Sequence, residues 1–125
     1  MIATTIKQSK KLIELGIDVN SADMHWQYIE EDNGQLQWFY FPKDFSINEN
    51  ESIPAWSLSA LIELIPNKIS ISDDLYYVCY KRNSAELRGP ITWNGHQKTK
   101  IFKADNILDA VFEMVCYLLE NKLIK

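Results

Sequence analysis

The strongest helical pattern in the chain is ADNILDAVFEMVCYLLENK, Ala104–Lys122, and the rest of the predicted fold packs around it. At the helical period, its apolar side chains cover about 200° of the helix surface, which is typical of a helix that other elements cover on most sides. What remains is a narrow acidic stripe, formed by Asp105, Asp109, Glu113 and Glu120. The pattern therefore predicts a largely buried helix that begins near Asp105.

The acidic stripe is predicted to face solvent and to have no catalytic role. Asp105 suits the N-cap, and Asp109 lies where the helix dipole favours negative charge. A carboxylate metal centre between helices would need histidines on facing helices, whereas His25 falls on an expected strand and His96 in an expected turn. No HxH, HExxH or CxxC spacing occurs either. We therefore predict no catalytic, cofactor-binding or metal-binding residue.

Two further helices are expected at residues 4–15 and 54–66. In the first, Gly16 suits the left-handed position that ends a helix, and Ile17 can fold back on Leu12. In the second, Ser57 is the expected N-cap, and Pro66 ends the helix because it lacks an amide hydrogen.

Strand patterns fill the rest of the chain. Residues 24–30 and 36–41 form a predicted hairpin around Asn33-Gly34, the strongest short hairpin signal. Residues 75–81 are predicted to form a strand, after a short run in which apolar Ile69 and Ile71 alternate with polar residues. Residues 82–85 are predicted to form a polar turn. A second hairpin is expected from residues 91–93 and 97–102.

The resulting order is α-β-β-α-β-β-β-α. It predicts an α+β domain of two layers, in which an antiparallel sheet of about 4–5 strands packs with three helices. No linker divides residues 1–125, so we expect a single domain.

Composition excludes several classes of function. A formal charge of −4 argues against a nucleic-acid binder, which normally carries a basic patch. No apolar run reaches the roughly 18 residues of a membrane span, and no N-terminal secretion signal is visible, so we expect a cytoplasmic protein. Cys79 and Cys116 lie in apolar segments and are expected to be buried, reduced thiols.

The aromatic residues suggest a binding surface. Six aromatic residues exceed what a small core needs, and Trp and Tyr are enriched at interface hot spots. They are Trp26, Tyr28, Trp38, Tyr40, Trp56 and Trp93. The predicted interaction surface comprises Trp26, Tyr28, Trp38 and Tyr40 of the first hairpin, with a polar rim of His25, Gln27 and Gln37. The sequence therefore favours a non-enzymatic protein-interaction or accessory domain, whose partner is another protein or a second copy of the chain.

The alternative function is the binding of a small molecule. The polar connection at residues 42–54 is the one segment long enough to cover a ligand against the sheet. The chain would then be a small-molecule-binding protein or an enzyme of unknown chemistry. A pocket that places His25 or His96 beside a carboxylate would favour this alternative.

Three blocks of the sequence resemble a known group of proteins. They are PAWSLSALIELIP (Pro54–Pro66), the Ala104–Lys122 stretch, and KKLIELGIDVNSADMHW (Lys10–Trp26). They are similar to small uncharacterised proteins of Bacteroides-type gut bacteria and their phages or mobile elements. That group has no known activity, so the resemblance implies a bacterial or phage cytosolic setting and no particular site residue.

Overall fold

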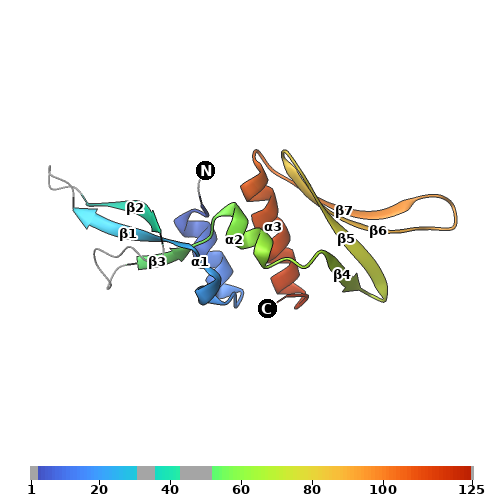
Figure 1. The fold of residues 1–125 in the computed structure, drawn as a ribbon, viewed down its shortest axis with the longest axis horizontal. Coiled ribbons are helices and arrows are strands. Elements are labelled where there is room, and N and C mark those ends of the chain that lie inside the picture. The colour runs from blue at the N-terminus through green and yellow to red at the C-terminus, as the bar shows by residue number, and fades with distance from the viewer. Residues whose placement is uncertain (1–2, 31–35, 43–51, 125) are drawn as a thin grey trace.

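Three helices lie between two antiparallel sheets in the computed structural model, which describes residues 3–30, 36–42 and 52–124 (Figure 1). The helices are α1 (Ile6–Glu14), α2 (Leu58–Glu63) and α3 (Ile107–Glu120), and a short 3-10 helix, η1 (Val19–Ser21), follows α1. The predicted α+β class is confirmed. The strands divide between two sheets, however, instead of forming the single sheet expected.

The two sheets lie at opposite ends of an elongated molecule (Figure 1). The first has the order β2-β1-β3 and contains β1 (Met24–Glu30), β2 (Leu36–Pro42) and β3 (Ser52–Ala55). The second has the order β4-β5-β6-β7 and contains β4 (Lys68–Ile71), β5 (Asp74–Lys81), β6 (Ser84–Ile91) and β7 (Gln97–Lys103). The first predicted hairpin is confirmed, because β1 pairs with β2. The second is confirmed as a pairing of β6 with β7, but its first strand spans Ser84–Ile91 and not the predicted residues 91–93.

The ends of α1 follow from local chemistry. The Thr5 hydroxyl accepts a hydrogen bond from the Gln8 amide at 3.0 Å, and the Thr5 amide donates to the Gln8 side chain at 2.9 Å, which forms a capping box. Gly16 ends the helix with a φ of +92°, and the Ile17 amide donates to the Leu12 carbonyl at 3.1 Å. The predicted helix stop is therefore confirmed.

The second helix begins later than expected. Residues 52–55 form β3 instead, which pairs with β1 at the edge of the first sheet. Pro54 fits there because an edge strand tolerates a residue without an amide hydrogen. Ser57 is the N-cap as predicted, and its hydroxyl accepts from the Ala60 amide at 3.2 Å.

Most of the core surrounds α3. Nine of its residues are buried, and the helix packs against α2 and against β6 and β7. Its N-cap is Asn106 and not Asp105, because the Asn106 side chain accepts from the Asp109 amide at 2.9 Å. One core cluster joins the helices to the inner face of the second sheet through Ile69, Ala85 and Leu87.

The turn expected at residues 82–85 is shorter, because β6 starts at Ser84 and pairs with β5 from its first residue. In β6, buried Ala85 and Leu87 alternate with Glu86 and Arg88, which pair with each other on the outer face. None of the helices in the described part of the chain combines the length and the apolar character that a membrane span requires.

Candidate functional site

The interaction surface predicted on the first hairpin is only partly described. The β1–β2 register sets Trp26 opposite Tyr40 and Tyr28 opposite Trp38, so the four positions are neighbours across two strands. Trp26 is half-buried, and its indole donates to the Thr4 carbonyl at 3.0 Å. The side chains of Tyr28, Trp38 and Tyr40 lie outside the described part of the chain, so this surface stays a prediction.

The proposed rim of that surface is partly wrong. His25 is 9% exposed and Gln27 is 0% exposed, so neither borders a solvent-facing patch. Both positions alternate with Trp26 along β1, and the face that they share is the covered one. The Gln37 side chain and most of the 42–54 segment lie outside the described residues, as does the ligand site expected beneath that segment.

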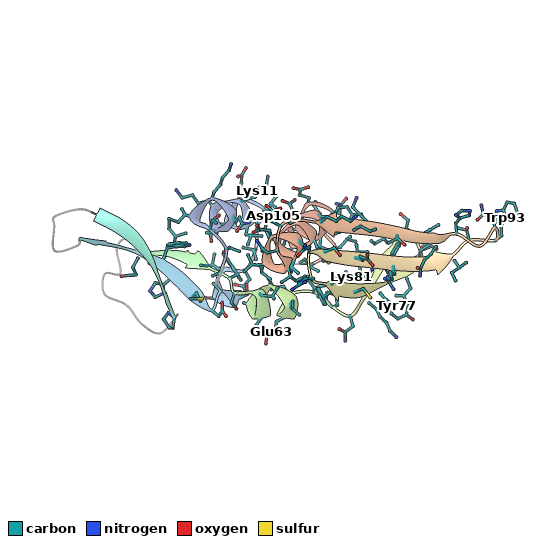
Figure 2. All side chains as sticks on the ribbon, turned by 90° about the horizontal axis from the view of Figure 1, so that it is seen from above. Lys11, Glu63, Tyr77, Lys81, Trp93 and Asp105 are labelled. Carbon is teal, nitrogen blue, oxygen red and sulfur yellow. The ribbon has the colours of Figure 1, made fainter. Side chains whose placement is uncertain are left out.

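The second hairpin forms a projecting arm, defined here as β6, β7 and the turn between them (Ser84–Lys103). It extends from the helices to the far end of the molecule, and Trp93 lies at its tip (Figure 2). The Trp93 side chain is 98% exposed, and Ile91 near the same tip is 69% exposed. A fully exposed indole contributes nothing to the core, so this large apolar side chain is available to a partner.

Hydrogen bonds within the turn hold the tip in one conformation. The Gly95 amide donates to the Thr92 carbonyl at 2.9 Å, and the Thr92 amide donates to the His96 carbonyl at 2.6 Å. The Thr92 hydroxyl also donates to the His96 carbonyl, at 2.8 Å. Gly95 has a φ of +85°, which is the glycine position of a three-residue hairpin loop. Trp93 is therefore the first loop residue of a well-bonded turn.

The arm belongs to a basic segment of an acidic chain. Residues 67–104, which include the whole second sheet, contain seven lysines and arginines against three aspartates and glutamates, a net charge of +4. The chain as a whole has a net charge of −4, so the remainder carries −8. This charge asymmetry places the positive potential around the arm.

A buried carboxylate organises the outer face of the second sheet. Glu86 is 5% exposed, and its carboxylate contacts Arg88 Nε at 2.9 Å and Lys81 Nζ at 3.3 Å. Burial raises the pKa of Glu86, but the hydrogen bonds from Arg88 and Lys81 outweigh it. The net pKa is therefore lowered from its ordinary value of 4.5.

Replacing this carboxylate should change stability in a pH-dependent way. Because its folded-state pKa is lowered, ionised Glu86 stabilises the fold above pH 4.5, and this contribution is lost as the pH falls through the folded-state pKa. We expect Glu86→Gln to unfold at lower urea concentration than the native chain at pH 7, with the difference shrinking in acid. A difference that stays constant with pH would contradict the ionic role.

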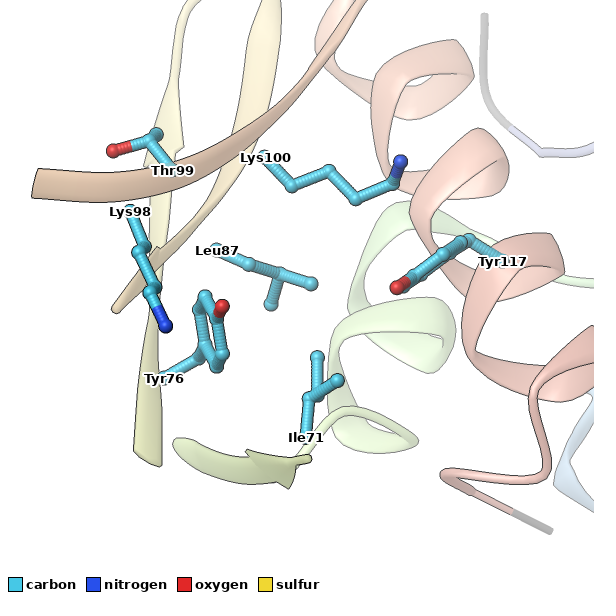
Figure 3. Close-up of a pocket in the computed structure, with 7 residues that line it drawn as sticks. All are labelled: Ile71, Tyr76, Leu87, Lys98, Thr99, Lys100 and Tyr117. Carbon is cyan, nitrogen blue, oxygen red and sulfur yellow. The ribbon is translucent and has the colours of Figure 1, made fainter. Parts of the chain in front are cut away.

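A pocket of about 300 Å³ opens on the inner face of the same sheet, beside α3 (Figure 3). Its lining residues come from all four strands and from the helix. They are Ile71, Tyr76, Leu87, Lys98, Thr99, Lys100 and Tyr117. Apolar side chains, two phenols and two ammonium groups thus meet in one concavity, which sequence reasoning missed because its lining residues come from five separate elements.

Gly89 fixes the position of Tyr76 in this pocket. A Cβ at residue 89 would lie 2.5 Å from Tyr76 Cε2, so the tyrosine ring crosses β6 where only glycine leaves room. We expect Gly89→Ala to destabilise the fold by about 1–3 kcal/mol through overpacking, measured by urea unfolding.

The cause of that loss can be tested in a Tyr76→Ala background. Without the ring, alanine at 89 should no longer destabilise, because alanine is generally favoured over glycine in a strand. An equal loss in both backgrounds would show that the Tyr76 contact is not responsible.

The acidic stripe faces solvent at Asp105, Glu113 and Glu120, as predicted, although Asp105 is not the N-cap that was expected. Asp109 accepts from the Gln8 side chain at 2.9 Å and from Asn106 at 3.0 Å. No group of three or more His, Cys, Asp or Glu side chains that could hold a metal ion occurs among the described residues.

Both cysteines are free. Cys116 is buried as predicted, and burial raises the pKa of its thiol to about 12. Cys79 is only half-buried, because it faces outward from β5 beside Glu86.

Comparison with known proteins adds no relative. No family model matches the chain, no curated protein matches it, and no solved structure matches its fold.

Proposed function

We propose that this chain is a non-enzymatic protein-interaction domain, which docks through the tip of its arm with Trp93 as the anchor. The observation that carries the proposal is the 98% exposure of a tryptophan on a hydrogen-bonded turn, at the end of the arm farthest from the core. The resemblance to proteins of gut bacteria and their phages supports a bacterial or phage cytoplasmic setting. Trp26, Tyr28, Trp38 and Tyr40 remain the second candidate surface.

The chemistry of Trp93 suits a binding anchor. Tryptophan is the residue type most enriched at interface hot spots, where burial of one large side chain can supply several kcal/mol of binding free energy. The turn holds the Trp93 backbone in place before any partner binds, which lowers the entropy cost of association. Ile91, 69% exposed, extends the apolar contact area.

The charge of residues 67–104, which include the arm, indicates the kind of partner. A segment of net charge +4 favours an acidic protein surface, and an apolar pocket in that surface would receive the indole. The three acidic residues of the segment and the charge of −8 on the rest of the chain oppose binding to a nucleic-acid polyanion. A second copy of the chain would offer acidic surface too, so a homodimer is one form that the complex can take.

Affinity capture from lysate of the source organism tests the proposal. The tagged native chain is compared with Trp93→Ser and with Val19→Ser, which removes an exposed apolar side chain outside the arm. We expect one protein, or the chain itself, to be enriched by the native chain and by Val19→Ser and lost with Trp93→Ser. Equal recovery with all three chains would refute docking through the tip.

A further inference from the structure

We propose that the pocket beside α3 binds a small organic anion, with a carboxylate head and a flat apolar body. This site is separate from the arm tip, and the inference does not depend on the proposed function. It rests on the cavity and on the side chains that line it (Figure 3).

The cationic character of the pocket comes mainly from Lys100. The Lys98 ammonium already contacts the Asp74 carboxylate at 2.7 Å, which raises the pKa of Lys98 and neutralises its charge locally. The Lys100 ammonium has no carboxylate within ion-pair distance in the described part of the chain. It lies 4.6 Å from the centre of the Tyr117 ring and 5.6 Å from that of Phe102, so two aromatic faces hold it at the pocket.

The rest of the lining fits a flat apolar body. Leu87 is fully buried, and Ile71 and the ring of Tyr76 stand beside it. Because Gly89 lets Tyr76 lie across β6, this apolar wall is in place without a ligand. The phenol of Tyr117 points into the same space and can donate a hydrogen bond to an anion beside Lys100 (Figure 3).

The volume limits the ligand to a small one. A pocket of about 300 Å³ is at the lower end of the range for small-molecule sites, so the size of a monocyclic aromatic acid is suitable. Few contacts are available to so small a ligand, and we expect a dissociation constant on the order of 1 mM or somewhat lower.

Benzoate is the probe, and benzamide is its neutral control of the same shape. In a two-dimensional ¹H–¹⁵N NMR titration of the full chain, benzoate should cause saturable shifts at Lys98–Lys100, Tyr76 and Tyr117. Benzamide should bind at least about fivefold more weakly, because it cannot pair with an ammonium group. Equal binding of the two compounds, or shifts that never saturate, would overturn the proposal.

Matched variants locate the anion. Lys100→Gln should weaken benzoate binding about five- to tenfold, whereas Lys103→Gln, on the opposite face of β7, should leave it unchanged. Tyr117→Phe keeps the ring and should weaken binding by a smaller factor. The same spectra report whether each variant is folded. Equal effects of Lys100→Gln and Lys103→Gln would refute the site.

Trp93→Ser tests whether ligand binding in the pocket is independent of the arm tip. It should leave benzoate binding unchanged, because residue 93 is not part of the pocket. Loss of benzoate binding in Trp93→Ser would place the ligand elsewhere and overturn the proposal.

Discussion

Trp56→Ala is expected to lower the free energy of unfolding by about 3–5 kcal/mol, as is usual when a large aromatic side chain is removed from a core. Trp56 is 0% exposed and joins elements that are distant in sequence. Its indole donates to the Ser21 hydroxyl at 2.9 Å, and its amide donates to the Thr4 hydroxyl at 3.1 Å. A loss of this size is a large fraction of the stability of a small protein.

Urea unfolding measures this loss, with Trp56→Phe as the control. Phenylalanine retains most of the apolar volume but not the indole N–H, so the Ser21 hydroxyl loses that donor and the expected loss is smaller, about 1–2 kcal/mol. If Trp56→Ala were no more destabilising than Trp56→Phe, Trp56 would not be the core residue that the structure shows.

Trp93→Ser should have the opposite profile, with little effect on folding and a large effect on association. Because the side chain is 98% exposed, we expect the free energy of unfolding to change by no more than about 0.5 kcal/mol. Loss of a tryptophan anchor should cost about 2 kcal/mol or more of binding free energy, which is roughly a 30-fold or greater loss of affinity.

Trp93→Ser should therefore reduce affinity without reducing stability, whereas Trp56→Ala should reduce stability. Calorimetry with the captured partner gives the affinity of each chain, and urea unfolding gives the stability. Val19→Ser should leave the affinity unchanged, since Val19 lies outside the arm. If Trp93→Ser unfolded the chain, the exposed position of Trp93 and the proposal based on it would both be contradicted.

Elements with strong local signals could be predicted from the sequence. The apolar surface of α3, the Gly16 stop and the Ser57 cap each depend on residues close together in the chain, and the structure confirms them. β3 was missed because it is only four residues long and contains Pro54. A proline directly before an apolar helical pattern is usually taken as the start of the helix. The start of β6 was missed because Arg82, Asn83 and Ser84 are polar and predict a turn, whereas Ser84 and Ala85 already pair with β5.

The candidate site was harder to predict than the fold. Trp56 and Trp93 are equally apolar residues in the sequence, yet one is fully buried and the other fully exposed. That difference arises because β6 and β7 extend beyond the helices, so that no other described element covers their turn (Figure 1). The pocket also depends on tertiary packing and not on local sequence. Lys100 and Tyr117 meet only because α3 packs on the second sheet.

A photo-crosslinking amino acid at position 93 would show whether the tip of the arm contacts a partner in cells. It is incorporated in cells of the source organism, beside a chain that carries it at Glu113, an exposed position on α3. We expect one discrete cross-linked protein from position 93, or a cross-linked dimer of the chain, and none from position 113. The same products from both positions, or none from position 93, would contradict the claim that the arm tip binds a partner.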